Sequence, residues 1–310
     1  MSPDGTAARG ERPGDQALRK GHETTKKSIA FILISGALYG VFYRLLQQTP
    51  QTELTHHTFT HLPIIPFISA FFFFTERKTI FSHQDRAITA GSIIACAGIA
   101  GFAISYAAGA YLSPNNVASL GTVSIITLWT GLFVLFFGTE ALKKARFPVL
   151  FLLFAVPIPL FILIPYVHFL QVLSTEAAHV IFMISGVTFV REGFMFHLPQ
   201  VSIEVADVCS GIRSSIALFI TGIMAGKLFL KKPVSKVILA LAVFPITIIK
   251  NGLRISGLAI LGSYVDSRIL HSDIHREGGK PFFILALLLL GLILWALKRW
   301  EKGVQERKTR

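Results

Sequence analysis

Apolar residues in this chain gather into long runs, separated by short polar segments that carry most of the charge. A helix needs about 20 apolar residues to cross the hydrocarbon layer of a bilayer, and several runs reach that length. The pattern therefore predicts an all-α integral membrane protein with about eight transmembrane helices. The predicted spans are 28–46, 60–75, 89–111, 118–138, 148–166, 211–229, 234–262 and 281–297.

Two segments between the predicted spans have a different pattern. Residues 167–186 are apolar, but Gln171 and two other polar side chains interrupt them, which favours a helix lying in the membrane interface. In 187–208, apolar and polar residues alternate between positions 201 and 205, the period of a β-strand. We therefore expect an interfacial helix followed by a short, outward-facing β segment, with turns near 191–193 and 199–200.

Composition supports a membrane protein and does not fit a soluble one. Of the 310 residues, 52% are hydrophobic and only 15% are charged, and the mean hydropathy is +0.61. A soluble domain of this size carries more charge and fewer apolar runs. The polar residues 1–27 are predicted to be a disordered tail, 28–297 a polytopic transmembrane domain, and 298–310 a basic tail.

The net charge of +13 predicts the orientation in the membrane. Both tails and the loops near 76–88, 139–147 and 227–236 hold 22 of the 30 Lys and Arg residues but only 9 of the 17 acidic residues. These segments therefore account for the whole net charge, and the positive-inside rule makes their side cytoplasmic. Both termini are predicted to be cytoplasmic, and the basic excess indicates topology and not nucleic-acid binding.

A cysteine at the start of the predicted span 211–229 is the first candidate for chemistry. Cys209 lies near a helix N-terminus, where exposed amide groups and the helix dipole favour a thiolate. Arg213 adds positive charge four residues later, and Gly211 leaves room for a peptide to approach. A lone cysteine at this position is more often structural, but the basic groups expected on the same side favour a nucleophile.

Arg254 and Asn251 lie three residues apart near the outer end of the span 234–262. An arginine within an apolar helix costs about 3 kcal/mol on insertion scales and usually faces a partner or a polar cavity. We expect the pair to donate hydrogen bonds to a substrate carbonyl or to the thiolate. The alternative is that Arg254 extends to the lipid headgroups.

His275, in the outward loop before the last span, is the candidate base, because its ordinary pKa suits proton transfer at neutral pH. The alternatives are an ordinary loop histidine, or His271 as the base. A metal site is a further alternative, although its loose spacing does not favour one, and we expect neither a metal nor another cofactor. The residues that such a site would use are His271, Asp273 and His275, with His56, His57 and His61.

These motifs together resemble the exosortase/archaeosortase family, over most of 60–297. The resemblance is carried by Cys209-Ser210-Gly211-Ile212-Arg213-Ser214, by Asn251-Gly252-Leu253-Arg254-Ile255, by His275 with Gly279, and by Pro157-Ile158-Pro159 and Leu198-Pro199.

The resemblance implies a membrane-embedded cysteine protease or transpeptidase with Cys209, Arg254 and His275 as its catalytic residues. Arg213 corresponds to a motif residue of less defined role. The implied substrates are exported surface proteins that end in a sorting tail, which combines a recognition motif of the Pro-Glu-Pro type, a transmembrane helix and a basic cluster. The implied location is the bacterial cytoplasmic membrane, with the site on the outer side and a lipid or glycan amine, or water, as acceptor.

Two other functions would fit a polytopic membrane protein. In a transporter, Arg254 and the outward histidines would line a transport path, but paired broken helices with inverted symmetry are not visible in the sequence. In a non-catalytic scaffold for the export of surface polysaccharide or protein, Cys209 would have no chemical role.

Overall fold

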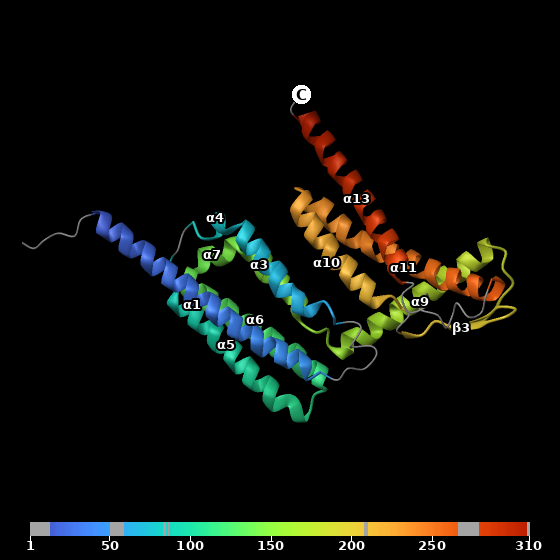
Figure 1. The fold of residues 1–310 in the computed structure, drawn as a ribbon, viewed down its shortest axis with the longest axis horizontal. Helices are drawn as coiled ribbons and strands as arrows, with labels where there is room; N and C mark the ends of the chain where they lie inside the picture. Colours follow the sequence, from blue (N-terminus) through green and yellow to red (C-terminus); the bar gives the residue numbers. More distant parts are fainter. Residues whose placement is uncertain are drawn as a thin grey trace, which may run out of the picture. The chain divides into compact units, whose positions relative to one another are not determined.

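The computed structural model describes residues 13–49, 59–82, 85, 87–207, 210–265 and 279–308. Its elements are helices and one small sheet (Figure 1). The chain forms two compact units, the first of residues 1–50 and 62–157 and the second of residues 51–61 and 158–310. The residues that the sequence analysis selects as candidate catalytic residues all belong to the second unit.

The first unit is a helical assembly built around the pair α5 and α6, which pack along their length. The helices approach closely because glycines face their neighbours, so that a Cβ added to Gly131 would lie 2.3 Å from the backbone nitrogen of Ala95. The helices of this unit are α1 (Pro13–Gln47), α3 (Ile65–Thr75), α4 (Arg77–Ile80), α5 (Ile88–Ala107), α6 (Pro114–Phe137), α7 (Thr139–Lys144) and α8 (Arg146–Phe151), with 3-10 turns η1 (Leu62–Ile64), η2 (Ala108–Ala110) and η3 (Leu152–Ala155).

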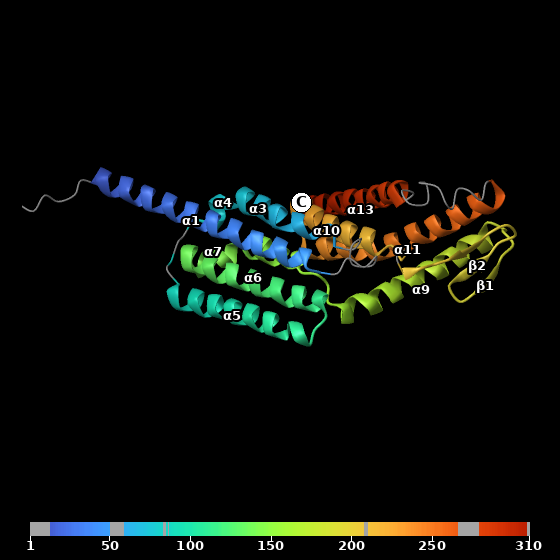
Figure 2. The same ribbon diagram turned by 60° about the horizontal axis from the view of Figure 1, so that its bottom comes forward.

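The second unit centres on a long helix, α11, which packs against three others, α9, α10 and α13. Figures 1 and 2 show the sheet beside α9. The four helices are α9 (Leu160–Ile184), α10 (Ile212–Phe229), α11 (Pro233–Tyr264) and α13 (Gly279–Lys308), and the strands are β1 (Val190–Glu192), β2 (Met195–His197) and β3 (Ser202–Glu204).

The sheet is antiparallel in the order β1-β2-β3, which confirms the predicted β segment. The alternation of the sequence places Val205 in the interior and leaves Glu204 exposed. Phe196 and Val205 pack with Phe182 of α9 and Ala259 of α11 in one buried cluster. The sheet is therefore fixed to both helices just before the chain enters the cysteine motif.

The helix inventory confirms the predicted fold class. Seven helices in the described part of the chain are long and apolar enough to cross a membrane. A further apolar helix, Leu62–Thr75, corresponds to the predicted span 60–75 but falls below that length. The seven are Lys26–Gln47, Ile88–Ala110, Pro114–Phe137, Leu160–Ile184, Ile212–Phe229, Pro233–Tyr264 and Gly279–Glu306.

The predicted boundary between a span at 148–166 and an interfacial helix at 167–186 is wrong. The helical segment Arg146–Ala155 ends before Pro157 and Pro159, which cannot extend a helix because proline lacks an amide hydrogen and restricts the preceding residue. The next helix, α9, then runs without a break from Leu160 to Ile184 and has the length and composition of a span.

Candidate active site

The cysteine motif lies where the sheet passes into α10, and its two flanks are well defined. Val208 and Cys209 themselves are outside the described residues. The backbone nitrogen of Ser210 donates to the carbonyl oxygen of Asp207 at 3.0 Å, and Ser210 is fully buried. A hydrogen bond therefore joins the residues on the two sides of Val208 and Cys209, and Ser210 is packed within the unit.

Gly211 begins α10 in a conformation that favours glycine. Its φ of +80° lies in the left-handed region, which other residues adopt at a cost of about 1–2 kcal/mol. A Cβ at this position would lie 3.2 Å from both Cγ and Oδ1 of Asn251, whose side chain is fully buried. The start of α10 thus lies directly against α11, and the structure brings together two residues that the sequence selected separately.

Arg254 follows Asn251 on α11, a little less than one helical turn later. Its side chain is half-buried. Its Nε atom is shielded from solvent and has no hydrogen-bond acceptor within the part of the chain that the structure describes. Because burying a donor without an acceptor is costly, this atom identifies Arg254 as a group suited to binding an additional acceptor.

Lys250 is a site residue that the sequence analysis missed. It precedes Asn251 in the interior of α11 and is only 4% exposed. Its Nζ donates a hydrogen bond to Oγ of Ser214, and Ser214 Oγ donates in turn to the carbonyl oxygen of Gly211 at 2.9 Å. The cost of a charge inside an apolar helix, which singled out Arg254, also applied to Lys250 and could have identified it.

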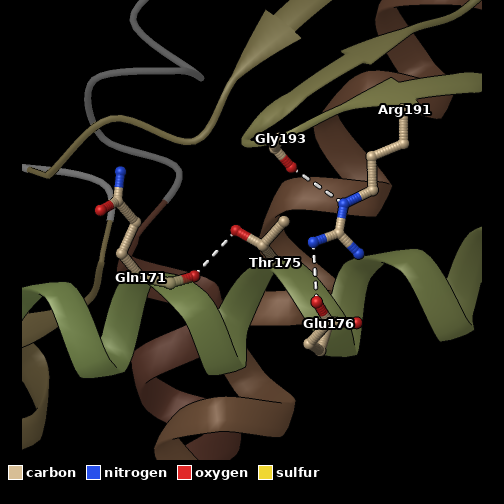
Figure 3. Close-up of polar contacts among 5 residues, drawn as sticks. All are labelled: Gln171, Thr175, Glu176, Arg191 and Gly193. Carbon is tan, nitrogen blue, oxygen red and sulfur yellow. Dashed lines mark hydrogen bonds and ion pairs between the residues drawn. The ribbon is translucent and has the colours of Figure 1, made fainter.

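Gln171 holds the strand that leads into the motif. Its Nε2 donates to the carbonyl oxygen of Val205 at 2.6 Å, and its side chain is buried among α9 and the end of the sheet. On the same face of α9, Thr175 Oγ1 donates to the carbonyl oxygen of Gln171 at 2.8 Å (Figure 3). The polarity of Gln171, which suggested an interfacial helix, instead serves an internal contact.

A second contact fixes the other end of the sheet to α9. Arg191 of β1 reaches Glu176, with its guanidinium 2.7 Å from the carboxylate, and its Nε donates to the carbonyl oxygen of Gly193 at 2.9 Å (Figure 3). The Arg191 guanidinium holds the Glu176 carboxylate in place at the edge of the unit. The sheet and the strand before Cys209 are thus anchored to one helix at two points.

The structure tests few of the other predicted residues. Arg213 is exposed on the first turn of α10, and the structure records no hydrogen bond for it within the described chain, whereas the adjacent Ser214 faces α11. His275, and with it the alternatives His271 and Asp273, falls in 266–278, outside the described residues. His56 and His57 are also outside them.

No group of three potential metal ligands occurs among the His, Cys, Asp and Glu side chains that the structure describes. The described site consists of two cations and an amide on α11, of which Lys250 and Asn251 contact the first turn of α10 and Arg254 follows on the same helix. Such an arrangement can bind and polarise a carbonyl oxygen or hold a thiolate, because each group donates hydrogen bonds and two carry positive charge.

Comparison with known protein families identifies a family for this chain. The model of a protein family described as transmembrane exosortase (Exosortase_EpsH) matches residues 52–298 and therefore covers most of the chain. No curated protein and no solved structure matches the chain significantly.

Proposed function

This chain belongs to the transmembrane exosortase family, and on that premise we propose that it is a cysteine peptidase or transpeptidase that cleaves the sorting tails of exported surface proteins. The seven long apolar helices of the described residues and the family of the chain make it a multi-pass membrane protein with a transpeptidase-like role. The observation that carries the proposal is the contact between Gly211 and Asn251, because it sets the cysteine motif against the helix of Arg254.

Covalent geometry limits how far Cys209 can lie from this contact. Consecutive Cα atoms are about 3.8 Å apart, so the Cα atoms of Cys209 and Gly211 are separated by at most about 7.6 Å. We propose that a substrate carbonyl at the Cys209 sulfur is held by Asn251 and by Arg254, three residues further along α11. This proximity supports a nucleophile and an oxyanion-binding group acting on the same carbonyl.

In the proposed reaction, His275 removes the thiol proton of Cys209, and the thiolate attacks the carbonyl carbon of the scissile peptide bond. Arg254 and Asn251 donate to the oxygen as it becomes negative, and Arg213 contributes charge from the exposed side of α10. The carbon–nitrogen bond then breaks, His275 gives its proton to the leaving amine, and a thioester to Cys209 remains. Water or an amine of a lipid or glycan releases the acyl group and regenerates the thiol.

The membrane supplies much of the substrate orientation in this proposal. A tail that docks its transmembrane helix beside the spans is already aligned, so few polar contacts are needed at the scissile bond. The distribution of basic residues supports cytoplasmic termini and a site on the outer side of the bacterial cytoplasmic membrane. Substrates would then be cleaved after export.

Mass spectrometry of a co-expressed tailed protein tests the proposal. With the wild-type enzyme we expect a new carboxyl end at the cut site, either free or joined to the acceptor. Cys209→Ala should insert normally and leave the tail uncut. Cys96→Ala is the matched control, because Cys96 is an exposed cysteine of α5 in the other unit, and it should cleave normally. Removal of the tail by Cys209→Ala would overturn the proposal.

A further inference from the structure

We propose that Lys250 is a positioning residue that holds the cysteine motif in its reactive place through Ser214 and the Gly211 carbonyl. The proposal rests on the proposed function, since it concerns the same site. It assigns a role to a buried charge that neither the cysteine motif nor the Asn251–Arg254 motif includes.

The burial of Lys250 needs an explanation. A lysine in the interior of an apolar helix is costly, and such residues usually pair with a specific partner or line a functional cavity. Among the described residues, Lys250 is hydrogen bonded to Ser214 Oγ, a neutral acceptor, and no carboxylate forms an ion pair with it. A further cation, Arg254, lies one turn away on the same helix. Two like charges so close together on one helix repel each other, so helix stability does not account for Lys250.

The contacts of Ser214 show what Lys250 holds. The Ser214 hydroxyl accepts from Lys250 and donates to the carbonyl oxygen of Gly211 at 2.9 Å. The same carbonyl accepts from the backbone nitrogen of Ser215 at 2.9 Å. Lys250 therefore ends a chain of hydrogen bonds that fixes one peptide group, and such chains strengthen each of their members by polarisation.

Neighbouring residues of α11 hold the two sides of that peptide group. Lys250 reaches its carbonyl oxygen through Ser214, while the Asn251 amide packs against the α-carbon of Gly211. On the upstream side, Gln171 fixes the carbonyl oxygen of Val205. Cys209 lies between these two anchors, so a change at the downstream anchor changes the position of the nucleophile.

Kinetics of purified full-length variants on a tailed substrate provide the first test. Lys250→Met removes the charged amine but keeps most of the length of the side chain, and Ser214→Ala removes the link. Each should lower kcat by about tenfold or more, because the peptide group that precedes α10 then loses its support and the nucleophile is displaced. KM should change by less than about threefold, since positioning acts on the chemical step.

The double variant and a conservative variant make the test specific. Because both residues act through one chain of contacts, Lys250→Met combined with Ser214→Ala should be no slower than the slower single variant. Ser214→Thr retains the hydroxyl and should keep kcat within about threefold of wild type. Lys236→Met, on the same helix but outside the network, is the matched control and should keep wild-type kinetics. Losses that multiply in the double variant, or a Lys250→Met enzyme with wild-type kcat, would overturn the proposal.

Hydrogen exchange separates this proposal from the proposed function. In the absence of substrate, the amides of 210–216 should exchange about fivefold faster in Lys250→Met and Ser214→Ala than in Lys236→Met, because the start of α10 opens more often. Unchanged exchange in both variants contradicts the positioning role even if Cys209 is confirmed as the nucleophile. Faster exchange supports that role even if Cys209→Ala still removes tails, an outcome that overturns the proposed function alone.

Discussion

Replacing Gly211 with alanine tests how closely the cysteine motif must fit against α11. The backbone at Gly211 has a φ of +80°, which costs about 1–2 kcal/mol for a residue with a Cβ. The added Cβ would also lie 3.2 Å from Cγ and Oδ1 of Asn251, so that one of the two must move by a few tenths of an ångström. The contact is relieved if the start of α10 shifts away from α11, and the backbone cost is relieved if residue 211 leaves the left-handed region.

Such a shift displaces the nucleophile relative to the groups that bind the oxyanion. If the resting enzyme relieves strain of 1–2 kcal/mol by this shift and must undo the shift to react, the rate falls by about 5- to 30-fold. Misplacing the reacting groups by about 1 Å can lower the rate by about 100-fold. We therefore expect kcat for a tailed substrate to fall by about 10- to 100-fold in Gly211→Ala.

A second glycine separates backbone strain from the contact with Asn251. Gly186 also has a positive φ, of +66°, but a Cβ there would meet nothing within 4 Å. Gly186→Ala should therefore lose a similar amount of thermal stability and keep its activity. If Gly211→Ala cleaves the substrate within about twofold of the rate of Gly186→Ala, the inferred contact between the motif and α11 does not matter for catalysis.

Three further substitutions probe the supports of the site and of the membrane helices. Gln171→Ala leaves the buried carbonyl of Val205 without its donor. The cost of about 1–3 kcal/mol should lower both the melting temperature and kcat. Unchanged values would contradict a role of Gln171 in holding the cysteine motif. Glu301→Ala removes the carboxylate that accepts from two backbone nitrogens just before α11, so the melting temperature in detergent should fall by an amount equivalent to about 1–2 kcal/mol with kcat unchanged. Gly131→Ala places a Cβ 2.3 Å from the backbone of α5 and should reduce the yield of folded protein. The control Gly36→Ala should not, because a Cβ there meets nothing within 4 Å. Equal yields would contradict the close packing of α5 and α6.

The sequence was informative where a feature depends on the local pattern alone. Long apolar runs located most of the spans, and alternation located the strand Ser202–Glu204, because burial in a bilayer or against one face of a sheet acts on each segment separately. The boundary within 148–186 was not predictable in this way. Gln171 reads as a polar interruption in the sequence, and only the folded chain shows that Val205 is its partner.

The candidate site shows the same limit. Asn251 and Gly211 were selected from separate motifs, and their contact is a property of how α10 packs on α11. The charge of Lys250 inside an apolar helix could have marked it as a site residue, but its partner Ser214, 36 residues away in the sequence, is shown only by the folded chain. Arg213 received weight for its spacing from Cys209, but the spacing did not reveal that its side chain is exposed while the neighbouring Ser214 faces α11.

Intact-mass analysis of the enzyme during turnover tests the central claim most directly. Mixing the full-length protein with a tailed substrate should give an adduct of the mass of the upstream fragment, which hydroxylamine removes and which peptide mapping assigns to Cys209. Arg254→Met should form this adduct much more slowly, because the oxyanion loses a charged donor. Cleavage that proceeds without any thioester, or through an adduct on Ser214 or Lys250, would contradict the assignment of Cys209 as the nucleophile beside α11.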